Sequence, residues 1–165
     1  MSPRPRRPAL AAPLVLILCA VCGGPPPEAV ESNAPPAGTT LDYARLPDAE
    51  MQRLVDSVDY IDYLFYEFEF SMSLDEDKGI KYAIAQIGED PATPRATCRP
   101  IGRVFYQISG RTAAEADLYF SPGCTYLTFL DDAGGVAYAN AMSAVGKDFF
   151  NNQFAQLIDD YQPVR

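Results

Sequence analysis

Acidic side chains are the most abundant groups in this sequence that could do chemistry. Glu67 and Glu69, like Glu115 and Asp117, are two residues apart, which places both carboxylates on one face of an extended strand. Two carboxyl groups about 5–10 Å apart across a cleft can hydrolyse a glycosidic bond. Such pairs are also common on exposed strands, and nothing in the sequence singles out one of them. We therefore interpret them as surface acids.

Other catalytic and metal-binding arrangements are excluded by composition or spacing. The sequence contains no histidine, which rules out Ser/His/Asp catalysis and histidine-ligated metals. In the acidic run Asp75–Gly79, glycine stands at the fifth position and not at the sixth that a calcium loop needs, and no glutamate follows at the twelfth. Asp131 and Asp132 precede a Gly-Gly turn of ordinary composition. We expect no enzymatic activity, no metal and no cofactor.

Two cysteines, Cys98 and Cys124, stand apart from the N-terminal pair. In an oxidising compartment an isolated pair is most simply a disulfide. Its loop of about 27 residues would contribute about 3.5 kcal/mol in the chain-entropy model. A redox-active pair is disfavoured because the sequence has no CxxC motif and no histidine to lower a thiol pKa.

The compartment is indicated by the first 22 residues. Arg4, Arg6 and Arg7 precede an apolar run from Ala9 to Val21, the order found in a signal peptide. The run is shorter than the roughly 20 residues that a membrane-spanning helix needs. A buried N-terminal helix is the alternative, which the arginines and prolines disfavour. We expect residues 1–22 to be a signal peptide.

The end of this segment carries a family resemblance. Cys22 follows Cys19-Ala20-Val21 and precedes Gly-Gly-Pro-Pro-Pro. Residues 1–22 resemble the signal region of bacterial lipoproteins, in which a cysteine after a short small-residue box is lipidated and becomes the first residue. That family prefers Leu where this chain has Cys19, and Ala, Gly or Ser where it has Val21. The resemblance implies lipidation of Cys22 and anchoring to a membrane of the cell envelope. The alternative is an ordinary signal peptide, cut near residues 20–24 to release a soluble secreted protein.

The net charge of the chain limits the kinds of partner that it can bind. The full chain carries a formal charge of −9, and removal of the three N-terminal arginines leaves 10 basic against 22 acidic residues. An acidic surface repels phosphate backbones and anionic headgroups. We therefore expect no nucleic-acid partner, and membrane contact only through the lipid.

Beyond residue 22 no family resemblance is recognised, and the organisation follows from composition and periodicity. Residues 23–45 are rich in Pro and Gly and predict a disordered tether. Residues 46–165 predict a single two-layer α+β domain with N-terminal helices, a four-stranded antiparallel meander sheet and a C-terminal helix. The expected helices are Asp48–Glu67, Leu74–Ile87 (with Ser73 and Glu76 as a capping box) and Ser143–Tyr161. A strand at Ile80–Ile87 is the alternative to the second helix, and the alternation from Phe68 to Leu74 suits an extended piece. The expected strands are Arg103–Ser109, Glu115–Phe120, Cys124–Leu130 and Val136–Asn140.

Aromatic residues suggest where such a domain would interact. Helices can cover only one face of the sheet, yet both faces of the predicted strands carry apolar or aromatic side chains. We take Tyr106, Tyr119 and Tyr126 as a candidate interface. The alternatives are that the tether, a loop or a second copy covers this face, or that the tyrosines line the rim of the core.

The sequence thus predicts an exported, lipid-anchored cell-envelope protein that acts as a protein-binding or structural module. One alternative is a small acidic periplasmic inhibitor, similar to an immunity protein, which would use its charge against a basic enzyme. The other is a soluble secreted ligand-binding domain.

Overall fold

The computed structural model describes residues 42–158 and 162–165. The predicted signal region with Cys22, and the predicted tether up to residue 41, lie outside the described residues. The elements in chain order are α1 (Asp48–Ser57), β1 (Tyr60–Phe65), β2 (Ser71–Leu74), α2 (Asp77–Ile84), β3 (Ile87–Pro91), β4 (Gly102–Ile108), β5 (Arg111–Ser121), β6 (Cys124–Leu130), β7 (Val136–Met142) and α3 (Ala144–Leu157).

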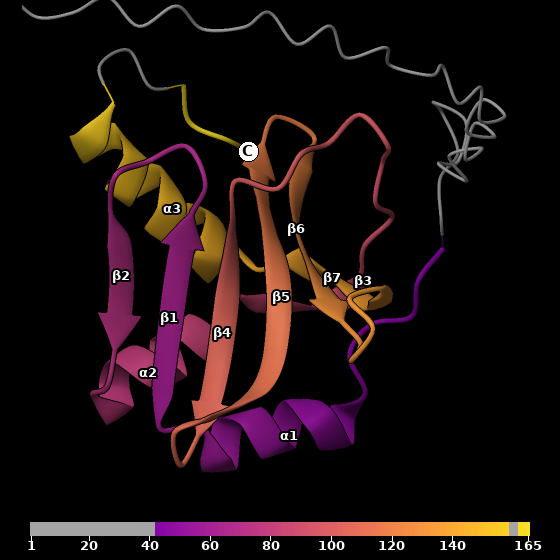
Figure 1. Ribbon diagram of the computed structural model, residues 1–165. Coiled ribbons are helices and arrows are strands. Elements are labelled where there is room, and N and C mark those ends of the chain that lie inside the picture. Colours follow the sequence, from indigo (N-terminus) through magenta and orange to yellow (C-terminus); the bar gives the residue numbers. More distant parts are fainter. Residues whose placement is uncertain (1–41, 159–161) are drawn as a thin grey trace, which may run out of the picture. The chain divides into compact units, whose positions relative to one another are not determined.

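The predicted fold class is wrong. In place of a four-stranded meander preceded by helices, the described residues form a seven-stranded sheet in the order β2-β1-β4-β5-β6-β7-β3 (Figure 1), and about 40% of these described residues are in strands. Every neighbouring pair is antiparallel. Strands β4 to β7 form a meander at the centre. β1 and β3 come from segments that we had assigned to helix and loop, and β2 comes from a segment that we had interpreted as an extended piece outside the sheet.

The first helix is shorter than predicted: it ends at Ser57 and not at Glu67, and strand β1 takes the place of its second half. The segment fits a strand because Ile61 and Tyr63 alternate into the core while Leu64 faces outward. β1 pairs with β4 along its whole length. Gly102 permits this pairing, because a Cβ atom there would lie 2.5 Å from the Leu64 carbonyl oxygen.

The second predicted helix, Leu74–Ile87, is also shorter than expected, because its first residue ends β2 and its last begins β3. Ser73, the predicted cap of this helix, instead donates its hydroxyl hydrogen to Asp62 Oδ1 on β1, at 2.5 Å. Ser143 does cap α3, since its Oγ accepts the Gly146 amide hydrogen at 3.1 Å. The predicted end of that last helix, Tyr161, lies outside the described residues.

In the view of Figure 1, α2 and α3 lie behind the sheet and α1 lies across one end of it. The main core fills the space between these helices and the sheet. Its most deeply buried large side chains include Leu54, Ile61, Tyr63, Tyr106, Leu118 and Phe150. An aromatic group from β1, β5 and α3 packs ring against ring within it, among them Phe65, Phe120 and Phe154. The main core therefore uses only one face of the sheet.

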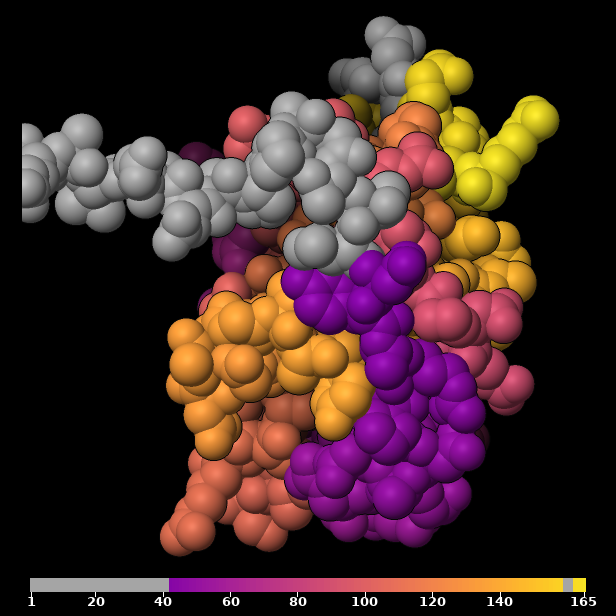
Figure 2. All heavy atoms as spheres, turned by 90° about the vertical axis from the view of Figure 1, so that its right-hand side faces the viewer, coloured from indigo at the N-terminus to yellow at the C-terminus, as the bar shows by residue number. Residues whose placement is uncertain are grey.

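A smaller cluster covers part of the opposite face. It contains Ala92, Cys98, Cys124, Tyr126 and Ala139, with Tyr43 and Tyr119 packed against it. Residues 42–45, which we assigned to the tether, lie against the sheet here: Tyr43 packs on the cluster, and the Ala44 carbonyl accepts the Ala139 amide hydrogen at 2.9 Å. Figure 2 shows this indigo start of the described chain lying against the orange strands. The half of this face over β6 and β7 is therefore occupied by the chain itself.

Candidate functional site

The three predicted interface tyrosines lie on two different faces of the sheet. Tyr106 is 0% exposed in the main core, where its ring stacks on Phe129 with centroids 6.1 Å apart. Burial raises its pKa above the ordinary tyrosine value. Tyr119 and Tyr126 stack on each other on the opposite face, with centroids 4.4 Å apart. Tyr126 is only 4% exposed, so of the three only Tyr119 presents appreciable surface.

The predicted disulfide between Cys98 and Cys124 is confirmed, with the two Cα atoms 5.8 Å apart. As expected, Cys98 lies on the loop that leads into β4, and Cys124 is the first residue of β6. The bridge holds this loop over Tyr126, whose hydroxyl oxygen accepts the Arg95 amide hydrogen at 3.4 Å. A loop therefore covers this half of the face, which is one of the alternatives considered above.

The described residues that pack on β6 and β7 do not extend over the other half of the face, which is formed by β1, β4 and β5. We call this half the open face and define it by Leu64, Tyr66, Arg103, Phe105, Glu115, Asp117 and Tyr119. Leu64 and Tyr66 are 46% and 53% exposed. Both residues lie inside the helix predicted from sequence, Asp48–Glu67, so neither was recognised as part of an interface. The alternation of Ile61 and Tyr63 with Asp62 and Leu64 was the available signal.

Arg103 is the centre of the open face. Its Nε donates to Asp117 Oδ1 at 2.8 Å, and its guanidinium lies 3.5 Å from Glu115 Oε2. The pKa of Arg103 is raised above the ordinary arginine value, chiefly because its guanidinium is hydrogen-bonded to Asp117. The Tyr66 hydroxyl donates to the same Asp117 oxygen at 3.3 Å. Glu115 and Asp117, considered above as a catalytic pair, thus hold a guanidinium and are not poised around a cleft.

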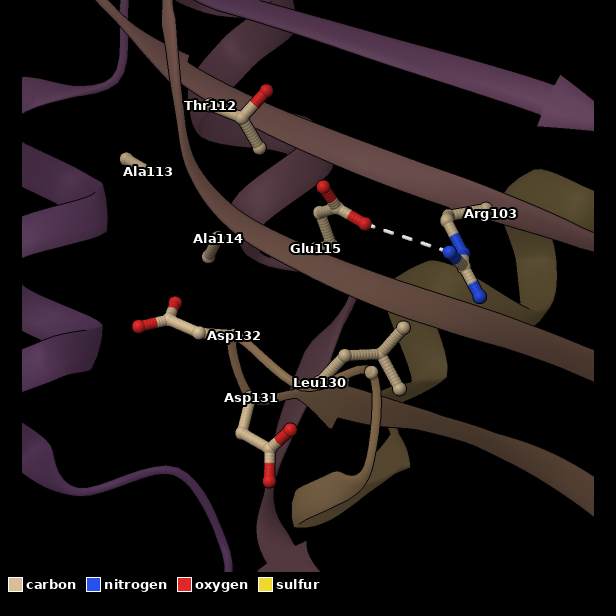
Figure 3. A pocket seen from close by; sticks show the side chains of 9 residues that line it. Arg103, Thr112, Ala113, Ala114, Glu115, Leu130, Asp131 and Asp132 are labelled. Carbon is tan, nitrogen blue, oxygen red and sulfur yellow. Dashed lines mark hydrogen bonds and ion pairs between the residues drawn. The ribbon is translucent and has the colours of Figure 1, made fainter.

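A recess of about 340 Å³ adjoins this cluster at the turn between β6 and β7. Its lining comes from Arg103, residues 112–115 of β5, and Leu130, Asp131, Asp132 and Gly134. Figure 3 shows Glu115 directed towards Arg103, while Asp131 and Asp132 point elsewhere. Asp131 shapes its own turn by accepting the amide hydrogens of Ala133 and Gly135 at 2.9 and 2.8 Å. In residues 42–158 and 162–165, no three His, Cys, Asp or Glu side chains are grouped to bind a metal.

Comparison with protein-family models, curated proteins and solved structures finds no match for this chain. Among the helices of the described part, none has the length and apolar character of a membrane span.

Proposed function

We propose that this chain is an exported cell-envelope protein, anchored by a lipid on Cys22, whose folded domain binds another protein through its open face. The observation that carries the proposal is the pair of exposed large side chains, Leu64 and Tyr66, beside the Arg103 ion pairs. Single exposed apolar residues are normal on a protein surface. Here they share a face with Phe105 and Tyr119, and aromatic residues with arginine are the side chains enriched at protein interfaces.

The arrangement of charges supports a protein partner more than a membrane or nucleic acid. On the open face, Arg103 is matched against Glu115 and Asp117, with Asp62 hydrogen-bonded nearby to Ser73 and Gln107. The net charge of this group is negative, like that of the whole chain. Such a surface is repelled by lipid headgroups and phosphates, so the lipid and the Pro-rich segment before residue 42 would hold the domain away from the membrane surface.

Site-specific photo-crosslinking in the native cells tests the open face. A photoreactive amino acid at Leu64 should give a discrete crosslinked product with one protein. The same group at Tyr82, which is 45% exposed on α2, is the matched control and should give none. The partner identified from Leu64 is then purified for binding measurements.

Dissociation constants complete the test. Leu64→Asp should weaken binding of that partner at least about tenfold, because a buried charge at an interface centre costs more than about 1.4 kcal/mol. Tyr82→Asp should leave the dissociation constant unchanged. Equal binding by both variants would remove the open face as the interface. A partner that proves to be a basic enzyme, bound tightly and in a salt-sensitive way, would identify the inhibitor alternative.

A further inference from the structure

The two edges of the sheet differ in ways that matter for binding. The β3 edge is blunted: the strand ends in Pro91, which has no amide hydrogen, and its register with β7 shifts between Ile87 and Pro91. Polar groups near this edge are already hydrogen-bonded. The Leu46 amide donates to Asn140 Oδ1 at 2.8 Å, and Asn140 Nδ2 donates to the Gly88 carbonyl oxygen at 2.8 Å. This edge offers no regular row of free backbone groups.

The β2 edge has the opposite character. Its sequence, Ser-Met-Ser-Leu, contains no proline, glycine or charge, and its four residues pair with β1 without a register shift. Among the described residues, no backbone hydrogen bond reaches β2 from the side away from β1. Figure 1 shows β2 as the outermost strand at this margin of the sheet. The outward N–H and C=O groups of β2 therefore form a short template for another strand.

Acidic residues frame this template at both ends. Glu67 and Glu69 precede β2, and Asp75 and Glu76 follow it, all of them exposed. The next acid, Asp77, is paired with Lys81 at 2.9 Å. Lys78 adds one positive charge, so the surroundings of β2 remain negative overall.

This charge pattern argues against two occupants of the edge. In a second copy paired antiparallel through β2, residues 67–69 of one chain would lie beside residues 75–76 of the other, and like charges across strands are destabilising. The chain's own residues 23–41 contain five prolines, two glutamates and no Lys or Arg. A segment of that composition can neither pair continuously nor complement the acids. The same pattern favours a strand that carries positive charge.

We propose that the β2 edge binds an extended, basic segment of another protein, which adds to the sheet as a further strand. Main-chain hydrogen bonds to Ser71–Leu74 would supply the binding, as in other cases of strand addition. Lys or Arg residues at the ends of the segment would face Glu69 and Asp75, which fixes register and excludes acidic or self-pairing strands. Leu64 is the cross-strand partner of Ser71, so the open face borders this edge. The two proposals are still read separately, because protection of the outward β2 amides reports strand addition, whereas crosslinking from Leu64 reports binding at the open face.

Hydrogen exchange of the purified protein with a synthetic probe tests the proposal. The probe is the blocked peptide Lys-Val-Thr-Val-Thr-Val-Lys, added at millimolar concentration in low salt. It should slow exchange of the outward amides of Ser71–Leu74 by at least about tenfold. The same peptide N-methylated at alternate residues, which cannot form the ladder, should give no protection. A peptide with Glu in place of Lys should give none either.

A charge swap supplies the decisive variant. Glu69→Lys with Asp75→Lys should lose the protection by the basic peptide and gain protection by the acidic one. Asp132→Lys with Asp148→Lys makes the same change of charge at exposed sites away from β2 and should behave as the wild type. The proposal is overturned if the basic peptide leaves the β2 amides unprotected, or if the charge swap changes nothing. It is also overturned if β2 becomes protected with increasing protein concentration alone, because a second copy would then be the occupant.

Discussion

At the scale of residues, the open face is organised by fixed polar contacts. Arg103 binds two carboxylates of β5, and Tyr66 reaches across to one of them. These side chains are already held in place, so a partner that docks on them loses less conformational freedom in forming the complex. On the covered half of the same face, the Cys98–Cys124 bridge has the corresponding role and holds a loop against Tyr126.

The disulfide should account for a measurable share of stability. Replacing Cys98 and Cys124 together by Ser should lower the free energy of unfolding by about 2–4 kcal/mol, because the unfolded chain is no longer constrained. Urea denaturation measures the difference. Wild type treated with reductant should unfold at the same midpoint as the variant. A variant as stable as the oxidised wild type would show that the bridge constrains nothing.

The two tyrosines of the main core should make the protein sensitive to alkali. Burial raises the pKa of Tyr63 and of Tyr106 above the ordinary value of about 10 that they regain on unfolding. The folded state therefore holds these protons more tightly, and the resulting stability is intact below pH 10 and is lost as the pH rises above it. We expect both to ionise only as the protein unfolds, in an absorbance titration of tyrosinate. Reversible ionisation of all ten tyrosines near pH 10 in the folded protein would contradict this.

At the scale of elements, the strands that could be predicted are those whose own sequence alternates between clear turns. β4 to β7 meet this condition, and Gly110 and Gly134 adopt the positive φ that their turns require. β1 does not, because Val58, Ile61 and Phe65 fit a helix while Ile61, Tyr63 and Phe65 fit a strand. Pairing with β4 decides between them, and that contact is distant in sequence. The same error hid Leu64 and Tyr66.

Ser143, which caps α3, and Ser73, which was predicted to cap a helix and does not, provide a test at this scale. Ser143 Oγ accepts the Gly146 amide hydrogen at 3.1 Å and donates to the Ala85 carbonyl at 2.6 Å. Ser143→Ala should therefore destabilise the protein by about 1–2 kcal/mol in a denaturation experiment. Ser73→Ala is the matched control and should cost less than about 0.5 kcal/mol, because Ser73 is exposed on an edge strand and caps no helix. A larger loss from Ser73→Ala would contradict this expectation and would show that its hydrogen bond to Asp62 stabilises the domain.

At the scale of the whole molecule, one sheet provides surfaces of different kinds. One face is buried under helices, the other is covered over β6 and β7 and open over β1, β4 and β5. One edge is blunted by Pro91, and the other is regular and framed by acids. The side of the sheet that the helices cover could not be read from sequence, because it depends on how distant segments pack. That is why Tyr106, grouped with Tyr119 and Tyr126 at first, belongs to the core.

Export is the step on which the proposed anchoring and the envelope role depend, and the mass of the mature protein tests it directly. Intact-mass and peptide analysis of protein taken from the membrane fraction of its native cells should find an N-terminus at Cys22 that carries acyl chains, with Cys98 and Cys124 oxidised. An unmodified N-terminus downstream of Cys22 would contradict the lipid anchor. A chain that still begins at Met1, with its arginines in place and both distal thiols reduced, would contradict export itself.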